Sequence, residues 1–201
     1  MKNLTEKSAE DFLEKEGFNI AKRELINKAS EISKVKISFP WAMKASGKNI
    51  NHKKNIGAVI LNIKSQKEAE AAFNKLKNTD GFEQAIIQEM ILGEELILGI
   101  KKTQEFGNAI MFGKGGVDVE KEKDITFRIP PINNEEAEAM IAETKVYNEI
   151  KNKINLKELK TNLIKLSKLA EKRKNIQELD INPIIINKDK AVIVDARLVL
   201  E

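Results

Sequence analysis

The pattern of hydrophobic and polar positions is clearest between residues 176 and 198, where a polar segment, 187–190, separates two apolar, β-branched runs. Such a pattern predicts a β-hairpin. A symmetric loop places residue 187 opposite residue 190 and, further along both strands, Asn182 opposite Asp195. Because side chains alternate between faces, one face is expected to form core. It carries Leu179, Ile181, Pro183 and Ile185 opposite Val192, Val194, Ala196 and Leu198.

The other face of this hairpin is apolar near the turn and polar toward the open end, with the pairs Asn182 and Asp195, and Asp180 and Arg197. Directly opposed residues have Cβ atoms about 5 Å apart, so an amide oxygen and a carboxylate there can share one cation. The pair has too few ligands for structural zinc and suits Mg²⁺, which completes its shell with water and phosphate oxygens. A hairpin end closed by an ion pair between Asp180 and Arg197 is the alternative.

The remaining periodicities predict an α/β fold with antiparallel character. Helical spacing and capping residues predict helices over 6–16, from about 28, over 65–76, from 133 and from 156. β-rich runs predict strands at 22–26, 39–44, 57–63, 85–90, 95–100, 108–112 and 125–129. The pattern changes near residue 90, which predicts two lobes, 1–90 and 91–201.

The composition narrows the functional classes. The 201 residues, 41% of them hydrophobic, can form the core of one domain or two joined lobes. The 35 basic and 31 acidic residues are mixed along the chain and aromatic residues are few, so nucleic-acid binding is not expected. No membrane helix or signal peptide is expected from the apolar runs. The absence of cysteine agrees with a cytoplasmic location.

Two further features suggest an anionic ligand. Lys44 ends a strand of buried character, where an ammonium group needs a partner such as phosphate. A lysine at a sheet edge that extends its charge to solvent is the alternative. The segment 112–116 follows a strand, and its glycines can present backbone N–H groups to an anion. Its spacing differs from that of a Walker P-loop and from GxGxxG, so it is unspecific by itself.

His52 is the only histidine of the chain and lies in the predicted loop 46–55, directly before Lys53 and Lys54. A single histidine in a loop is commonly just solvated. Two adjacent cations favour the neutral, nucleophilic imidazole and attract a phosphorylated partner. Phosphoryl capture by His52 is therefore a second interpretation.

Short motifs along nearly the whole chain resemble, in order and spacing, those of the ATP-grasp subunit of ADP-forming acetyl-CoA synthetases. The first are Lys44, His52-Lys53 and Gly57-Ala58-Val59. The later ones are Gln88-Glu89-Met90, Gly93-Glu94-Glu95, Phe106-Gly107, 111–116 with Glu120, Phe127-Arg128-Ile129, 177–183 and 194–197. Each motif is unspecific alone, and their shared order makes the resemblance specific.

The resemblance implies an ATP-grasp fold, in which two α/β lobes hold ATP or ADP and Mg²⁺ between their sheets. It implies that Gln88, Glu89 and Met90 contact adenine and ribose and that Lys44 reaches the phosphates. Asn182 and Asp195 match the Mg²⁺ ligands of the family, the same pair that the hairpin register brings together. The other matching positions of the nucleotide site are Glu95, Gly115, Gly116, Glu120 and Arg128.

The resemblance also implies a catalytic role for His52. It occupies the position of a histidine on a mobile loop that takes a phosphoryl group from a phosphohistidine of the α subunit and passes it to ADP. The chain would then be the β subunit of an ADP-forming acid–CoA ligase. It would act with a CoA-binding α subunit, as a heterotetramer, on acetyl-CoA or a related acyl-CoA.

A nucleotide-binding regulatory module without turnover is the alternative to an enzyme. The joint presence of Lys44, His52, Asn182 and Asp195 favours the enzyme. Several positions depart from the family pattern, namely Lys54-Asn55, Ala58, Lys114 and Asp118. Ala58 bears most on function, because a methyl group there can restrict a backbone that approaches phosphate.

Overall fold

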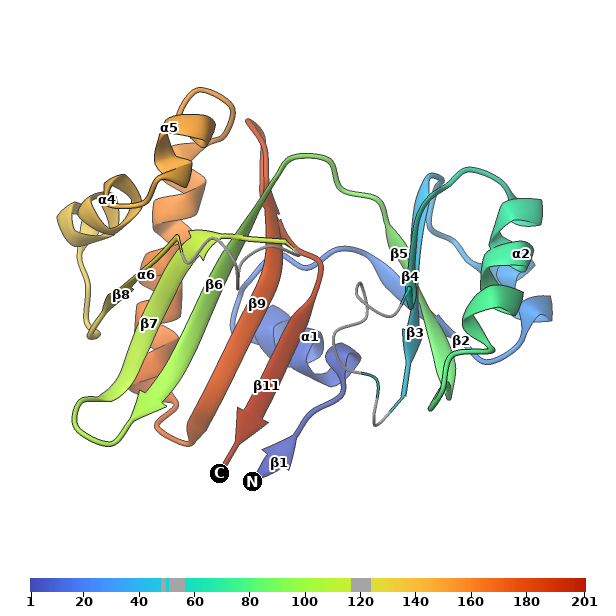
Figure 1. Cartoon of the computed structure of the whole chain (residues 1–201), viewed down its shortest axis with the longest axis horizontal. Coiled ribbons are helices and arrows are strands. Elements are labelled where there is room, and N and C mark those ends of the chain that lie inside the picture. The colour runs from blue at the N-terminus through green and yellow to red at the C-terminus, as the bar shows by residue number, and fades with distance from the viewer. Residues whose placement is uncertain (48–49, 51–56, 117–123) are drawn as a thin grey trace. The chain divides into compact units, whose positions relative to one another are not determined.

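The structure is a computed structural model that describes residues 1–47, 50, 57–116 and 124–201, and it divides into two compact units (Figure 1). One unit is residues 21–91, and the other combines residues 1–20 with 92–201. This division differs from the expected lobes 1–90 and 91–201 at the N-terminus. The reason is non-local pairing, since β1 (Lys2–Asn3) lies antiparallel to β11 (Ala196–Leu200) and α1 (Glu6–Lys15) packs against the same strand.

The unit of residues 21–91 contains an antiparallel sheet in the order β2-β5-β3-β4. Its strands are β2 (Arg23–Ile26), β3 (Trp41–Ser46), β4 (Val59–Ile63) and β5 (Gln84–Glu89). The helix α2 (Gln66–Leu76) and the short 3₁₀ helix η1 (Ala29–Lys34) pack with one face of the sheet. Met43, Ala45 and Ile87 of the sheet pack there with Ala69 and Phe73 of α2.

The start of α2 follows the predicted capping chemistry. Ser65 accepts a hydrogen bond from the backbone N–H of Glu68 (3.3 Å), as expected for an N-cap. The Glu68 carboxylate accepts from the backbone N–H of Lys64 (2.9 Å), one residue before the cap. The predicted helix from about residue 28 is only the 3₁₀ turn η1, which is typical of short connecting segments.

The larger unit contains a seven-stranded sheet in the order β1-β11-β9-β6-β7-β8, with β10 paired to β9. In addition to β1 and β11, its strands are β6 (Glu94–Thr103), β7 (Gly107–Lys114), β8 (Ile125–Arg128), β9 (Ile176–Ile186) and β10 (Ala191–Ile193). Its further helices are α4 (Asn134–Ala142), α5 (Val146–Ile150) and α6 (Leu156–Lys172). All strand pairs described here are antiparallel, as the sequence pattern predicted.

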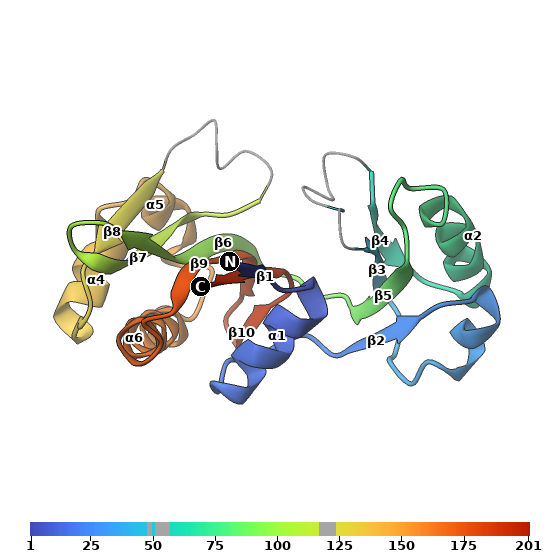
Figure 2. The same ribbon diagram turned by 90° about the horizontal axis from the view of Figure 1, so that it is seen from below.

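The helices α1, α4 and α6 cover one face of this sheet (Figure 2). Leu159, Leu163 and Leu166 of α6 form the predicted apolar stripe and are fully buried. The N-caps Thr5, Asn133 and Asn155 accept backbone N–H groups as expected. The short helix α5 was not predicted. None of the helices within the described ranges is long and apolar enough to cross a membrane.

The predicted register of the C-terminal hairpin is confirmed. Ile186 pairs with Ala191 next to the turn, and Leu179 pairs with Leu198 toward the open end. Between these pairs, the backbone N–H of Asn182 donates to the carbonyl of Asp195 (3.2 Å). Asn182 and Asp195 therefore lie directly opposite each other, as the symmetric loop predicted.

The predicted core face of the hairpin is correct for only half of its length. Leu179 and Ile181 belong to the hydrophobic core of this unit, but beyond Pro183 the core contains Ile184 and Ile186 in place of Ile185. On the facing strands, likewise, Ala191 and Ile193 join the core in place of Val192 and Val194. The register between β6 and β9 shifts between Leu96 and Leu98, so two residues of β9 oppose one of β6. Such a bulge reverses the alternation of side chains.

Candidate functional site

The bulge of β9 places Asn182 beside the glycine segment that follows β7. Its side-chain Oδ1 accepts a hydrogen bond from the backbone N–H of Gly116 (2.9 Å). Asn182 and Asp195 are both partly buried, and their backbones are joined across the hairpin. An amide oxygen and a carboxylate on directly opposed residues are suitable ligands for one hard cation such as Mg²⁺.

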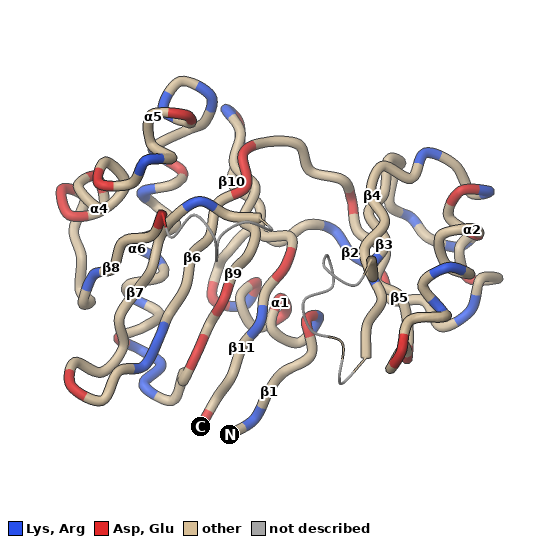
Figure 3. Tube along the Cα trace, viewed as in Figure 1, with Lys and Arg blue, Asp and Glu red and all other residues tan. Residues whose placement is uncertain are grey.

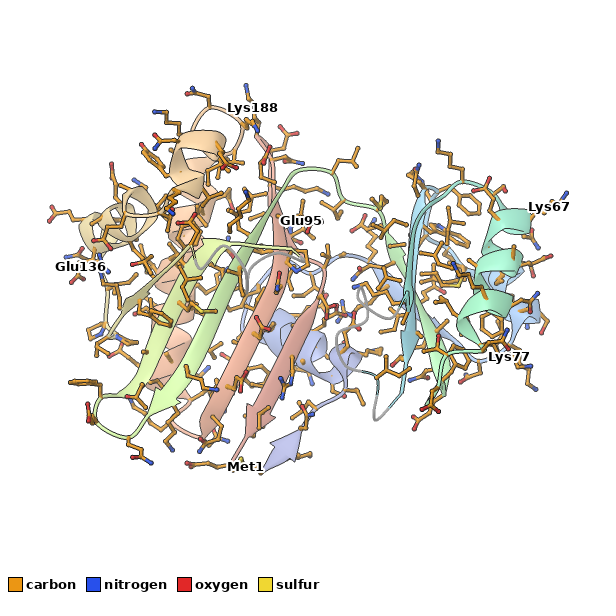
Figure 4. The ribbon with its side chains drawn as sticks, in the orientation of Figure 1. Met1, Lys67, Lys77, Glu95, Glu136 and Lys188 are labelled. Carbon is orange, nitrogen blue, oxygen red and sulfur yellow. The ribbon has the colours of Figure 1, made fainter. Side chains whose placement is uncertain are left out.

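Glu95 lies near the start of β6 (Figure 4), and its Oε2 would lie 2.9 Å from a Cβ at Gly116, the residue that donates to Asn182. Its neighbour Leu96 points into the core, so Glu95 faces the side of the sheet opposite the helices. The backbone carbonyl of Glu95 accepts from the N–H of Gly115 (2.9 Å). The structure thus brings Glu95, Gly115, Gly116 and Asn182 into one group within the larger unit. Among the described residues no cluster of three or more His, Asp or Glu residues forms a metal site.

The glycine segment does not present all its N–H groups to an anion, as its composition had suggested. The N–H of Gly115 is bonded to Glu95 and that of Gly116 to Asn182. The glycines are needed for close approach, because a Cβ at Gly115 would lie 2.5 Å from the carbonyl carbon of Leu96. The segment is therefore seated against β6 and β9.

Charged residues continue across the same sheet toward the open end of the hairpin (Figure 3). The Lys101 Nζ lies 2.9 Å from Oε2 of Glu178, and Nη1 of Arg197 lies 3.9 Å from Oε1 of the same residue. The alternative prediction paired Arg197 with Asp180. The register does place these two opposite each other, but the ion pair recorded for Arg197 within the described part of the chain is with Glu178.

Lys44 and Gln88 lie on one face of the four-stranded sheet in the other unit. Gln88 is paired with Ala42, two residues before Lys44, so both side chains are on the face opposite α2. Lys44 is 4% exposed and Gln88 is 1% exposed. Lys44 belongs to β3, which continues to Ser46 and lies between β5 and β4 in the sheet. The alternative of a solvent-reaching lysine at a sheet edge is therefore wrong.

Glu89 ends β5, Met90 follows it, and both are hydrogen-bonded to neighbouring segments of the chain. Oε1 of Glu89 accepts from the backbone N–H of Lys22 (2.8 Å), and the N–H of Glu89 donates to the Lys22 carbonyl (2.9 Å). The N–H of Met90 donates to the carbonyl of Pro40 (3.1 Å). The Glu89 carboxylate therefore has a structural role. The predicted contacts of Gln88, Glu89 and Met90 with adenine and ribose stay a prediction.

Arg128 is not part of the group around Asn182. It pairs with Ile110, a core residue, so its side chain is on the helix-covered face of the sheet. Its guanidinium forms an ion pair with Glu143 and donates to Oγ1 of Thr126 (3.2 Å). Hydrogen bonds from Arg128 and then from Thr126 lower the pKa of Glu143 below its usual value. The expectation that Arg128 binds the nucleotide is not supported by this geometry.

Several predicted positions lie outside the described residues, namely His52, Lys53, Lys54, Asn55, Asp118 and Glu120.

Two departures from the family pattern, Ala58 and Lys114, lie within the part of the chain that the structure describes. The methyl group of Ala58 belongs to the core around α2 and is fully buried. Lys114 lies 3.5 Å from a carboxylate oxygen of Glu149 on α5 and is partly exposed.

Asp124 is a buried residue that sequence reasoning missed. Its carboxylate accepts from the backbone N–H groups of Lys145 (2.8 Å) and Val146 (2.7 Å), at the start of α5. Its carbonyl accepts from the N–H of Lys114 (3.2 Å). Asp124 therefore links the glycine segment to α5. The groups that it caps lie 21 and 22 residues away, so no local capping pattern could identify it.

Comparison with known proteins identifies the same family in sequence and in structure. Residues 1–200 match the family described as ATP-grasp domain. The chain is 36% identical over 204 residues to acetate–CoA ligase (ADP-forming) II of Archaeoglobus fulgidus, covering 98% of this chain and 30% of that protein. It is 35% identical over 212 residues to the β subunit of acetate–CoA ligase (ADP-forming) I of Pyrococcus furiosus, covering 98% of this chain and 91% of that subunit.

Solved structures of an acetyl-coenzyme A synthetase from Ca. Korarchaeum cryptofilum are also similar. One complex with coenzyme A and Ca-AMPCP has a TM-score of 0.93 at 30% identity and covers 100% of this chain and 94% of that chain. Another contains Mg-AMPPCP, with a phosphohistidine segment pointing towards the nucleotide-binding site. Its TM-score is 0.85 at 30% identity, covering 100% of this chain and 93% of that chain.

Proposed function

The chain belongs to the family of ATP-grasp β subunits of ADP-forming acetate–CoA ligases, and from this premise we propose that it is the nucleotide-binding subunit of an ADP-forming acyl-CoA synthetase. Its cofactors would be ATP or ADP and Mg²⁺. The observation that carries the proposal is the direct opposition of Asn182 and Asp195, because it joins two hard oxygen ligands at one place in a chain of this family.

In the proposed reaction an acyl-CoA, ADP and phosphate are interconverted with the free acid, CoA and ATP. The phosphoryl group passes from a phosphohistidine of the α subunit to His52 and from His52 to ADP. Each transfer breaks one bond to phosphorus and forms another, so no additional reactant is needed. A histidine suits the role of carrier because neutral imidazole is a nucleophile at neutral pH.

The described residues fit the binding part of this proposal. Asn182 and Asp195 would hold Mg²⁺, whose charge would balance that of the phosphate oxygens. Lys44, whose side chain is buried on the face of the sheet opposite α2, would reach the phosphates, as the family motif implies. Glu95, Gly115 and Gly116 would shape the site around Asn182.

A partner subunit is part of the proposal. The Pyrococcus furiosus relatives are named β subunits, and the chain spans only 30% of the Archaeoglobus fulgidus relative. We propose that a CoA-binding α subunit supplies the rest of the active machinery and that the two form a heterotetramer. The substrate would be a small carboxylic acid or its CoA ester.

Among the departures from the family pattern, Ala58 bears most on the alternative of a weakened regulatory module. Its methyl group packs in the core of its unit, so it does not narrow a ligand site from that position. The carbonyl of Ala58 accepts from the N–H of Ala45 (2.9 Å), an ordinary strand contact. No described feature of Ala58 therefore favours the regulatory module over the enzyme.

Calorimetry with ADP and ATP, in Mg²⁺ and in EDTA, tests the proposal. We expect the double variant Asn182→Ala with Asp195→Ala to bind nucleotide at least about tenfold more weakly in Mg²⁺, or roughly 1.4 kcal/mol. In EDTA its affinity should stay within about twofold of wild type. The matched control, Asn187→Ala with Asp189→Ala, removes the same two side-chain types from the hairpin turn and should retain the Mg²⁺ dependence.

The outcomes separate binding from folding. Equal weakening of the double variant in Mg²⁺ and in EDTA would contradict the metal assignment, because the loss would then be structural. A wild-type chain that binds neither nucleotide under any of these conditions would contradict the proposed function itself.

A further inference from the structure

The hydrogen bond between Gly116 and Asn182 determines which end of the Asn182 amide is fixed. Of the two ends of an Asn amide only the oxygen accepts a hydrogen bond, so the atom at 2.9 Å from the Gly116 nitrogen is Oδ1. This oxygen has two lone pairs, and the Gly116 N–H occupies one of them. The second can bind a cation while the hydrogen bond remains.

The position of Gly116 is suited only to glycine. Its φ is +95°, in the region that side chains with a Cβ rarely adopt. A Cβ there would lie 2.9 Å from Oε2 of Glu95. The preceding residue, Gly115, donates to the carbonyl of Glu95 and packs against the backbone of Leu96. Gly116 therefore has little room to shift. The N–H direction is therefore set by the chain, and the Asn182 side chain follows it.

We infer that Gly116 is a positioning residue, whose backbone N–H orients Asn182 so that Oδ1 serves as a metal ligand beside Asp195. The inference rests on the proposed Mg²⁺-nucleotide function and adds a role that the glycine-rich composition did not suggest. The composition predicted only that the glycine N–H groups can be presented directly to an anion. Here, the Gly116 N–H acts on the phosphates through Asn182 and the cation.

The substitution Gly116→Ala tests this role, with Gly107→Ala as its matched control. Gly107 also has a positive φ, +71°, but a Cβ there would meet no atom within 4 Å. Both variants carry comparable backbone strain. Only Gly116→Ala is expected to disturb Asn182.

We expect Gly116→Ala to weaken ADP binding in Mg²⁺ by about tenfold, with a change of less than about twofold in EDTA. Gly107→Ala should match wild type in both solutions. Binding of Mn²⁺ to the protein with ADP, followed by electron paramagnetic resonance, should weaken in parallel for Gly116→Ala alone. Thermal unfolding of the two variants measures the strain that they share.

A second variant removes the donor without adding a side chain. A backbone ester in place of the amide N–H of Gly116 eliminates the hydrogen bond and leaves the glycine in place, so it tests the inference even if Gly116→Ala fails to fold. We expect the same selective loss in Mg²⁺. An ester or alanine variant with wild-type Mg²⁺ dependence would overturn the inference and leave the proposed function standing.

The remaining outcomes are also decisive. Equal weakening in Mg²⁺ and EDTA would show that Gly116 affects nucleotide binding independently of the metal, which contradicts the inference. A wild-type chain whose nucleotide binding is indifferent to Mg²⁺ would contradict both the inference and the metal assignment of the proposed function.

Discussion

Arg128 and Glu143 show how a single charged residue can match a family motif and still have a structural partner. The guanidinium of Arg128 is bonded to Glu143 and Thr126, and the hydrogen bonds that Glu143 accepts from Arg128 and then from Thr126 lower the pKa of its carboxyl. The Arg128 side chain is also on the helix-covered face of the sheet, whereas Glu95 is on the other. The charge of Arg128 is therefore balanced locally, and its contribution in this structure is to join β8 to the end of α4.

His52 carries the sharpest prediction at the scale of one residue. In-line transfer requires reacting atoms within about 3.5 Å, so a phosphohistidine of another subunit needs an intermediate acceptor to reach ADP. We expect His52→Ala to abolish phosphoryl exchange between the α subunit and ADP, with nucleotide affinity within about twofold of wild type. The measurement is acid-labile, base-stable label on this chain after incubation of the reconstituted complex with labelled acetyl phosphate.

The neighbouring variant Asn51→Ala controls for changes in the same segment and should keep both label and exchange. Label that persists on the chain in His52→Ala would show that another residue carries the phosphoryl group. ATP synthesis at the wild-type rate without His52 would show that the imidazole is only solvated.

At the scale of elements, Glu16 links the end of α1 to the end of α6. Its carboxylate lies 2.7 Å from Nζ of Lys172 and 2.6 Å from Nη2 of Arg173. The hydrogen bond from Lys172, followed by that from Arg173, lowers the pKa of Glu16 below its usual value of 4.5. The guanidinium of Arg173 also lies over the ring of Phe12. These contacts attach the N-terminal helix to the C-terminal end of α6 in the same unit.

The lowered pKa of Glu16 predicts a pH-dependent contribution to stability. A carboxyl whose pKa is lower in the folded state stabilises the fold above its unfolded pKa, and this stabilisation is lost as the pH falls through the folded pKa. Glu16→Gln should therefore lower the free energy of unfolding at neutral pH, and the difference from wild type should disappear in acid. Lys172 and Arg173 are 62% and 43% exposed, so solvent screening limits the effect to about 1 kcal/mol or less.

Urea unfolding at a series of pH values from neutral to about pH 3 measures this difference. Glu105→Gln is the control, because Glu105 is exposed in the turn between β6 and β7. The free energy of unfolding of this control variant should differ from that of wild type by the same amount at every pH. A difference between Glu16→Gln and wild type that persists unchanged at low pH would show that packing, and not the charge, makes the link.

The elements also show what the sequence could and could not predict. The hairpin register followed from a symmetric loop, which sets every later pair including Asn182 with Asp195. The reversal of faces at Asn182 could not be predicted, because the bulge depends on pairing with the distant strand β6. The same limit applies to Asp124, whose partners on α5 are far along the chain. Local periodicity carries no information about such contacts.

At the scale of the whole molecule, the division into units was predicted near residue 90 and missed at the N-terminus. The boundary between residues 91 and 92 lies close to the change in hydrophobic pattern near residue 90, and such a change can be read from a sequence. The assignment of residues 1–20 depends on β1 pairing with β11, at the opposite end of the chain. Lys2 and Leu200 are neighbours in that ladder, and nothing in the short N-terminal segment identifies its partner strand.

The extent of the chain relative to its relatives supports a final prediction about activity. Residues 1–200 match one ATP-grasp domain, and the chain covers 30% of the Archaeoglobus fulgidus ligase. We therefore propose that the CoA site and the first phosphohistidine lie outside these residues. We expect the purified 201-residue chain to bind MgADP but to form no acetyl-CoA from acetate, CoA and ATP.

Addition of a purified α subunit should restore the complete reaction, and chromatography of acetyl-CoA together with ADP release measures it. The control is the same mixture with the Asn182→Ala and Asp195→Ala double variant, which should stay inactive because the α subunit cannot replace the metal ligands. Acid-dependent and CoA-dependent ADP release by the isolated chain, with contaminating subunits excluded, would contradict the division of labour. It would place a CoA site within the 201 residues, and no separate partner subunit would then be needed to bind CoA.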